Sequence, residues 1–294
     1  MDCQDVAIRP TVVCREMTEG DFEVVTGLLT NGFAAWREAP FWQRALRRLA
    51  DRVVPAGMPQ LGYVLEVSGA VVGVLLLIAS EWTEAGELVR RCNVSSFYIE
   101  PEFRLYGTLL VRQALRRRDV TYINVTPAPE TWDLLAAQGY KRYASGRTIM
   151  LPLLARSAGG ARARFAGRSI PPGPDLAAAE IELMREHANW DCLNLICETE
   201  SGRVPFVFGL RHRRGVLPFA YLLYCRSQAS LAAHARALGF ALARRGIFLI
   251  VADADSKVAG VPGRFQPGHP KFFRGDKAPQ AGDLAYTERA VFGA

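Results

Sequence analysis

The chain has 294 residues, of which 50% are hydrophobic, 10% aromatic and 22% charged, and its formal net charge is +7. This composition excludes a disordered or fibrous protein, and the length favours two domains. A protein with a positive net charge attracts polyanions such as nucleic acid, acidic lipid or a phosphorylated cofactor. No basic segment is interleaved with aromatic residues, so nucleic acid is not an expected partner.

Membrane and metal chemistry are not expected either. The longest apolar run, 70–79, has about half of the roughly 20 residues that a membrane-spanning helix needs. The first ten residues lack a secretory pattern, so a cytoplasmic protein is expected. The four histidines have no metal-ligand spacing and the cysteines form no CxxC pair, which predicts reduced thiols and no bound metal. The cysteines are Cys3, Cys14, Cys92, Cys192, Cys197 and Cys225.

The first half of the sequence predicts alternating strands and helices. Thr18, followed three residues later by Asp21, is typical of a helix N-terminus, and Ser68-Gly69 is typical of a two-residue hairpin turn. The predicted elements are an extended segment at 11–17, helices at 22–33 and 41–52, strands at 62–67, 70–78 and 88–99, a helix at 106–118, a strand at 120–125, a helix at 130–138 and a strand pair around 140–153.

A stretch rich in Gly, Pro and Arg at 156–174 reads as a linker. It predicts an N-terminal domain at 1–155 and a C-terminal domain at 175–294. The predicted C-terminal elements are a helix at 176–189, strands near 193–198, 204–211 and 216–225 with a hairpin turn at 213–215, a helix from Leu231 to Leu242, a buried strand at 247–252, a Gly/Pro-rich loop at 260–275 and a β-prone segment at 284–292.

The element order describes a mixed α/β fold in which an antiparallel meander leads into a crossover of strand, helix and parallel strand. At this crossover, residues 95–110 carry the clearest chemical signal. A strand ends at Pro101, and a helix begins around Gly107. The first backbone N–H groups of a helix suit a phosphate, Gly107 lets a phosphate approach closely, and Arg104 adds a charged contact.

The pattern Ile99-x-Pro101-x-x-Arg104-x-x-Gly107, followed by an apolar helix, resembles the coenzyme A segment of the GNAT superfamily of N-acyltransferases. The resemblance covers residues 11–153 and implies a GNAT-like acyltransferase fold with acetyl-CoA or another acyl-CoA as co-substrate. In that family the strand before the loop splays from its neighbour and pairs with the pantetheine arm. By resemblance, the pantetheine would bind Phe97, Tyr98 and Ile99, and the pyrophosphate would bind the amides of Arg104, Leu105, Tyr106, Gly107, Thr108 and Leu109.

Two positions depart from the family pattern. Leu109 stands where the family usually has a second Gly or Ala, which would tighten the loop or shift the cofactor. Leu135 stands where the family often has a Tyr general acid, four residues before a pair that is here Gly139-Tyr140. The usual route for protonating the leaving thiolate is therefore missing from the sequence.

Acyl transfer to an amine needs a base for the ammonium proton and a donor for the thioester oxygen or the leaving thiolate. Glu81 and Glu100 are the candidate bases, and each also reads as an ordinary exposed carboxylate. Tyr98 and Tyr143 are the candidate donors, with half-buried strand residues as the alternative.

Three other residues, two acidic and one a thiol, have a chemical role only as one of two alternatives. Asp253 and Asp255 would either bind a hard cation or cap a turn. Cys92 would either be a nucleophile or, by default, a buried thiol.

The second half predicts an abbreviated GNAT-like unit in tandem with the first. Its equivalent loop, 226–230, has neither Pro nor Gly, so we expect it to bind no coenzyme and instead to shape an acceptor cleft or bury an open sheet edge. The loop at 260–275 is either a mobile lid for an anionic acceptor or an ordered surface loop. Its cationic residues are Arg264, His269, Lys271 and Arg274.

The sequence therefore predicts an acyl-CoA-dependent N-acyltransferase, with an acetyltransferase as the first choice, acting on the amine of a small metabolite or amino sugar. One rival is a catalytically silent acyl-CoA-binding or regulatory protein, favoured by Leu109 and Leu135. Another is a tRNA-dependent aminoacyl transferase of the same architecture, which would explain the positive charge. The acyl length, the acceptor and the oligomeric state stay open, with a homodimer as one option.

Overall fold

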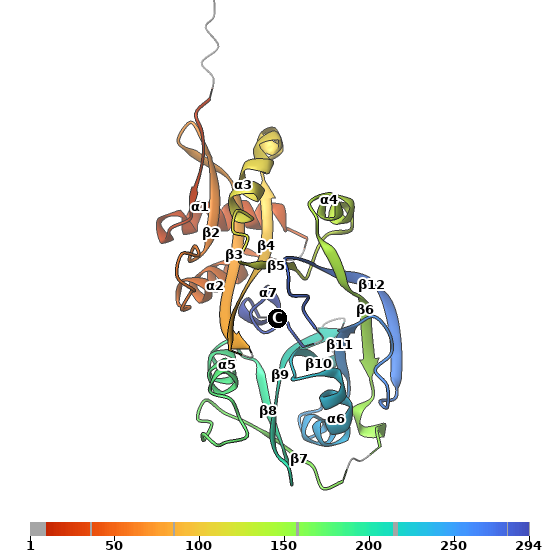
Figure 1. The fold of residues 1–294 in the computed structure, drawn as a ribbon. Coiled ribbons are helices and arrows are strands. Elements are labelled where there is room, and N and C mark those ends of the chain that lie inside the picture. Colours follow the sequence, from red (N-terminus) through yellow and green to blue (C-terminus); the bar gives the residue numbers. More distant parts are fainter. Residues whose placement is uncertain are drawn as a thin grey trace, which may run out of the picture. The chain divides into compact units, whose positions relative to one another are not determined.

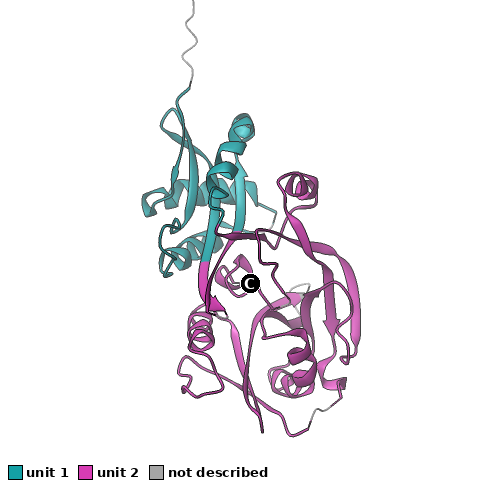
Figure 2. Ribbon diagram, in the orientation of Figure 1, with its two compact units in different colours: residues 1–79, 94–118 teal, residues 80–93, 119–294 magenta. Residues whose placement is uncertain are grey.

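A computed structural model shows two compact units (Figure 2). The first combines Met1–Ala79 with Val94–Arg118, and the second combines Ser80–Asn93 with Asp119–Ala294. Two long strands therefore contribute residues to both units. The predicted hairpin turn at 213–215 includes residues 214 and 215, which lie outside the described residues, as does Cys3. The structure describes residues 10–35, 37–84, 86–156, 159–213, 217–280 and 282–293.

The first unit is built on strands in the order β1–β2–β3–β4. Its predicted elements are confirmed with shifts at their ends, and the helix predicted at 106–118 is shorter than expected. The elements are β1 (Val12–Glu16), the 3₁₀ helix η1 (Glu19–Asp21), α1 (Phe22–Gly32), α2 (Ala39–Ala50), β2 (Gly62–Val67), β3 (Ala70–Glu84), β4 (Glu87–Ile99), the 3₁₀ helix η2 (Pro101–Tyr106) and α3 (Gly107–Ala114), as Figure 1 shows.

Local signals explain two of these boundaries. The carboxylate of Asp21 accepts the backbone N–H of Thr18 at 2.9 Å, which fixes the chain at the entry to α1. Ser68 and Gly69 have φ values of +50° and +86°, as a two-residue turn between β2 and β3 requires. The sequence predicted both features correctly.

Asp21 gives the first unit a pH-dependent stability. The Arg15 guanidinium donates to the Asp21 carboxylate at 2.8 and 2.9 Å and holds its pKa at about 2, below its ordinary value of 3.8. Because the folded pKa lies below the unfolded one, this stabilisation is present above about pH 4 and is lost as the pH falls through about 2. We expect Asp21→Asn to lower the free energy of unfolding by about 2 kcal/mol near neutral pH, and the difference to shrink toward zero in acid. Urea unfolding of both proteins across this range measures it, and a difference independent of pH would contradict the assignment.

The two faces of β4 pack against different helices. The ring of Tyr98 lies directly against Gly32 at the end of α1. On the opposite face, a Cβ added to Gly107 would meet Ile99 Cδ1 at 3.1 Å and Phe97 Cζ at 3.3 Å. Alternate strand residues point to opposite faces, so α1 and α3 cover opposite sides of this strand.

The second unit continues the strand order as β4–β5–β12–β6–β11–β10–β9–β8–β7. The helix α6 packs its buried face into an apolar core with β8, β9 and β10. The elements are β5 (Thr121–Asn124), η3 (Pro129–Thr131), α4 (Trp132–Ala137), β6 (Lys141–Met150), η4 (Pro152–Leu154), β7 (Arg162–Phe165), α5 (Ala178–Asn189), β8 (Leu193–Thr199), β9 (Gly202–Arg213), β10 (Leu217–Tyr224), α6 (Gln228–Ala243), β11 (Ile250–Ala254), β12 (Gly263–Arg274) and α7 (Glu288–Val291).

Three predictions for this unit are wrong. The segment 140–153 contains the single strand β6 and the start of η4 rather than a strand pair. The Gly/Pro-rich segment at 260–275 is neither a lid nor a surface loop, because β12 lies between β5 and β6 and is antiparallel to both. The C-terminal segment contains the short helix α7 instead of a strand. In the last two cases the segment contacts partners that are distant in the sequence. Local secondary-structure propensity carries no information about such partners.

The compact units divide the chain differently from the predicted boundary at 156–174. Residues 119–155 belong to the second unit, and the predicted linker lies inside it. Part of that linker forms β7, which pairs antiparallel with β8. A separable domain at 1–155 stays a prediction.

The element order repeats along the chain. The antiparallel strands β2 and β3 and their neighbour β4 are followed by α3 and by β5, which is parallel to β4. The antiparallel strands β8, β9 and β10 are likewise followed by α6 and by β11, which is parallel to β10. This repetition supports the tandem arrangement, which we retain as a proposal.

Candidate functional site

The predicted coenzyme segment begins where β4 leaves its parallel neighbour. In the part of the chain that the structure describes, β4 pairs with β5 over residues 91–93 against 121–123 and then continues to Ile99. Ser96, just beyond this pairing, has a φ of +52°, in the left-handed region that residues with a side chain rarely adopt. A strand that outruns its partner leaves backbone groups for another extended group to pair with.

Gly107 stands where β4 and α3 come into contact. Its φ of −57° is ordinary for a helix, so the need for glycine here comes from the close approach of Phe97 and Ile99. The Gly107 N–H donates to the carbonyl of Arg104. The segment 104–109, expected to be a loop, is therefore helical, because η2 continues directly into α3. The exposed side chain of Arg104 lies in this segment. The phosphate contact at 104–109 stays a prediction.

Apolar side chains flank this segment at the surface. Phe97, Leu105 and Leu109 are 44%, 90% and 39% exposed. Phe97 lies against Gly107, so its ring borders the first turn of α3. Exposed apolar groups beside helix N–H groups suit a ligand with an anionic part and an apolar part, as an acyl-CoA has.

The candidate bases from the sequence lie in ordinary surroundings. Glu81 belongs to the second unit, where its carboxylate accepts a hydrogen bond from Arg90 at 3.1 Å. Arg90 also donates to Asp119 at 2.7 Å, and these hydrogen bonds raise the pKa of Arg90. Glu100 follows β4 directly, and its backbone N–H donates to the carbonyl of Val72. The geometry places Glu81 in a partly exposed ion pair with Arg90.

Tyr98 and Tyr143, the predicted donors, belong to different units. Tyr98 packs on α1, as described above. The Tyr143 hydroxyl is buried without a hydrogen-bond partner, and burial raises the pKa of Tyr143 well above its usual value, with Asp253 adding to the effect. Leu135 stands at the position where the resembled family often has a tyrosine. It is a core residue with 8% of its surface exposed.

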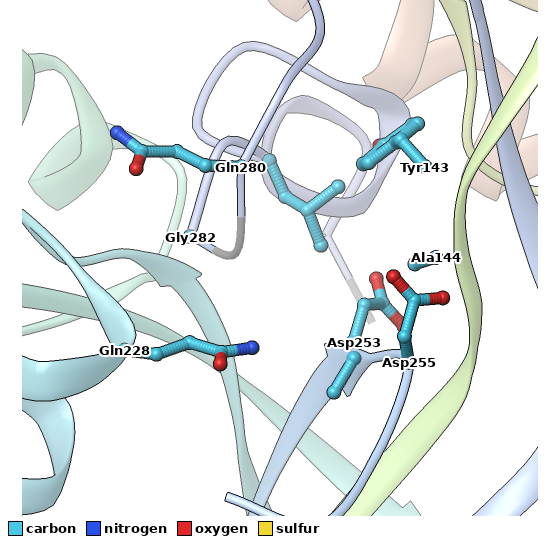
Figure 3. Close-up of a pocket in the computed structure, with 9 residues that line it drawn as sticks. Tyr143, Ala144, Gln228, Asp253, Asp255, Gln280 and Gly282 are labelled. Atoms are coloured by element: carbon cyan, nitrogen blue, oxygen red, sulfur yellow. The ribbon is translucent and has the colours of Figure 1, made fainter.

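Tyr143 borders a cavity of about 200 Å³ in the second unit. Figure 3 shows Tyr143, Asp253 and Asp255 on one side of it and Gln228 and Gln280 on the other. The sequence singled out both aspartates, as cation ligands or turn caps. Asp255 accepts the Ser145 N–H of β6 with its Oδ1 at 2.8 Å, a contact between residues distant in sequence rather than the cap of a turn. Groups of three or more metal-ligating side chains do not occur among the residues that the structure describes.

Asp253 lies in a buried polar cluster. Its Oδ1 accepts the Tyr221 hydroxyl at 2.6 Å and is 3.8 Å from Nζ of Lys271. Lys271 is 1% exposed, and burial lowers its pKa to about 8 although Asp253 opposes the shift. The other oxygen, Oδ2, is buried without a hydrogen-bond partner. Sequence reasoning placed Lys271 on a surface loop and therefore missed this cluster.

A second carboxylate, Glu288 of α7, lies where the β4–β5 pairing ends. The Asn93 side-chain amide donates to its Oε2, and the Thr126 hydroxyl donates to its Oε1 at 2.5 Å. Asn93 is the last residue of β4 that pairs with β5, and Thr126 follows β5. No sequence signal indicated Glu288, because Asn93 is 195 residues away along the chain.

Helices long and apolar enough to cross a bilayer are absent from the described part of the chain. Cys92 is fully buried, as the default reading expected. The five described cysteines are all free thiols.

Several solved structures resemble this chain. A candidate acetyltransferase from Pyrococcus horikoshii matches with a TM-score of 0.57 and 12% identity, over 96% of this chain and 96% of its own. A GCN5-related N-acetyltransferase from Kribbella flavida matches with a TM-score of 0.56 and 17% identity, over 91% of this chain and 72% of its own. A GCN5-related N-acetyltransferase from Anabaena variabilis matches with a TM-score of 0.56 and 11% identity, over 90% of this chain and 72% of its own. No protein-family model matches the sequence, and no curated protein matches it.

Proposed function

We propose that this chain, which has the mixed α/β fold of the GCN5-related N-acetyltransferases, transfers an acyl group from acyl-CoA to an amine of a small metabolite or amino sugar. An acetyl group is the first donor to test. The fold is the one that the sequence predicted. The acyl-CoA dependence, the acceptor and the tandem origin are parts of the proposal.

The observation that carries this function is the course of β4. The strand continues beyond its pairing with β5 and leads into α3, whose first residue, Gly107, packs against the strand. The strand residues 94–99 lie beyond the pairing, and Gly107 keeps the start of α3 close to Phe97 and Ile99. An extended pantetheine arm fits along a free strand edge, and a pyrophosphate fits at the helix N-terminus. The residues present therefore fit coenzyme A, with Phe97, Tyr98 and Ile99 beside the arm and residues 104–109 beside the phosphates.

The protein must then remove a proton from the acceptor. The thioester supplies an activated acyl carbon, the new bond is an amide C–N bond, and the bond broken is C–S. A protonated amine must first lose a proton to a base, whereas a thiol with a pKa near 8.5 can leave as thiolate near neutral pH. Our candidate base is Glu288 of the second unit, which accepts hydrogen bonds from Asn93 and Thr126 and keeps further lone pairs.

Release of free thiol tests the function directly. The purified protein is mixed with acetyl-CoA, or with longer acyl-CoAs, and with a panel of small amines. Thiol release that requires an amine supports an N-acyltransferase. Binding of acyl-CoA without thiol release, across the whole panel, would favour the catalytically silent protein instead.

The two candidate tyrosines should matter less than the base. Because a thiolate can leave unprotonated, we expect Tyr98→Phe and Tyr143→Phe each to lower the acyl-transfer rate by less than about tenfold. Steady-state kinetics of the single variants between about pH 6 and 9 measures this. A much larger loss confined to one variant would make that tyrosine the general acid.

A further inference from the structure

Two long stretches of the sequence contain basic residues and no acidic ones. Residues 134–174 include seven lysine and arginine residues, and residues 201–252 include eight arginines. Both stretches belong to the second unit. A surface that they form together therefore carries positive charge that no carboxylate of either stretch can neutralise.

The two stretches meet where η4, which follows β6, packs against α6 (Figure 1). A Cβ added to Gly239 of α6 would lie 2.8 Å from the Leu153 backbone nitrogen. Phe248 belongs to the same end of β6, because Ile250 pairs with Met150, the last residue of that strand. Residues of η4, α6 and the segment before β11 therefore lie together in the second unit.

Large apolar side chains project from these elements into solvent. Between 43% and 65% of the surface of each is exposed, and they are Leu151, Leu154, Phe240 and Phe248. A single exposed apolar residue is ordinary on a protein surface, whereas a group of them on adjoining elements is typical of a binding surface.

Arginines surround these apolar side chains. Arg236 Nη1 donates to the Ala155 carbonyl next to η4 at 3.4 Å, and its guanidinium lies 5.5 Å from the centroid of the Phe240 ring. Arg156, Arg244 and Arg245 are exposed like Arg236. We call these four arginines, together with Leu151, Leu154, Phe240 and Phe248, the basic apolar surface.

The composition of this surface restricts its partner. Arginine side chains attract polyanions and can donate two parallel hydrogen bonds to one phosphate. Nucleic acid offers phosphates, but contact with its backbone would leave the protruding leucines in water. A bilayer with anionic lipid offers phosphates at its surface and an apolar layer beneath them, so both kinds of side chain are satisfied there.

We propose that the basic apolar surface binds to a bilayer that contains anionic phospholipid. Leu154 and Phe240 enter between the lipid headgroups, and the arginines bind lipid phosphates. Binding of this kind uses no membrane-spanning segment. The inference is independent of the acyltransferase function, because none of these residues belongs to the proposed coenzyme or base site.

Flotation of the purified protein with lipid vesicles tests the proposal. One set of vesicles is phosphatidylcholine alone, and the other mixes it with phosphatidylglycerol in equal amounts. We expect binding to the mixed vesicles to be at least about tenfold tighter, because the arginines face anionic headgroups. Raising the salt concentration from about 0.05 M to about 0.5 M should weaken this binding, since salt screens the attraction.

A pair of charge variants separates this surface from the overall positive charge. We expect Arg244→Glu to weaken binding to the mixed vesicles by about tenfold, and Arg162→Glu, with the same change in net charge, to leave it unchanged. Arg162 is exposed on the other face of β7, since Ala163 and Phe165 pack into the core that includes α6.

A pair of leucine variants tests the apolar contact. We expect Leu154→Ser to weaken binding to the mixed vesicles by about tenfold, because the side chain no longer enters the bilayer. Leu134→Ser is the matched control, since Leu134 is 55% exposed on α4, which lies far from α6 in Figure 1. Melting temperatures check that all four variants are folded.

Three other results would overturn the proposal. The first is a failure to bind the mixed vesicles, or equal losses in each variant and its control. The second is binding to single-stranded RNA that Arg244→Glu weakens and Leu154→Ser does not, which would assign the surface to nucleic acid. The third is a dimer that Leu154→Ser separates, without vesicle binding, which would assign the surface to a second copy of the chain.

Discussion

Replacing Glu288 with glutamine should lower kcat/KM for acyl transfer by roughly 100-fold or more. Glutamine keeps the size of the side chain and can still accept the Thr126 hydroxyl, but it cannot take a proton from an ammonium. The acidic limb of the pH–rate profile, which reports an essential base, should flatten in this variant. A residue that only ties α7 to Asn93 and Thr126 would change stability and leave the shape of that profile intact.

Two further glutamine variants complete this experiment. Glu81→Gln tests the base that the sequence favoured, and we expect a smaller loss than for Glu288→Gln because Glu81 is already paired with Arg90. Glu182→Gln is the matched control, since Glu182 is exposed and pairs with Arg185 on the surface of α5. A loss of about 100-fold confined to Glu81→Gln would restore Glu81 as the base and reject Glu288.

Gly107→Asp should weaken the binding of coenzyme A at least tenfold, which corresponds to roughly 1.4 kcal/mol. The substitution puts a negative charge at the start of α3, where the expected phosphates bind, and its Cβ would press on Ile99 and Phe97. Calorimetric titration of the folded variant with coenzyme A measures the effect.

Gly107→Asn separates charge from bulk. Asparagine has nearly the shape of aspartate without the charge, so both variants share whatever is lost through crowding against Ile99 and Phe97. We expect the asparagine variant to bind coenzyme A several-fold more tightly than the aspartate variant, because of phosphate repulsion. Unchanged affinity in both folded variants would show that the coenzyme does not bind at this turn.

The sequence by itself determined the elements that depend on near neighbours. The hairpin turn at Ser68-Gly69, the Thr18 and Asp21 helix start and the strand-to-helix segment ending at Gly107 are set by local backbone preferences and by helix or strand periodicity. The order of these elements predicted a mixed α/β fold, and the resemblance of residues 99–107 to the coenzyme A segment of the GNAT superfamily implied an acyltransferase fold. It also brought Tyr143, Asp253 and Asp255 to attention, although not their shared cavity.

Only the tertiary structure decided which distant groups meet. Residues 260–275 read as a loop because Gly and Pro punctuate them, yet pairing with β5 and β6 on both sides makes them a strand and buries Lys271 beside Asp253. Glu288 reaches Asn93 across 195 residues, a contact that leaves no periodic signal in the chain. Candidate catalytic and binding groups therefore emerged from long-range strand pairing, whose free energy depends on partners that local sequence patterns do not encode.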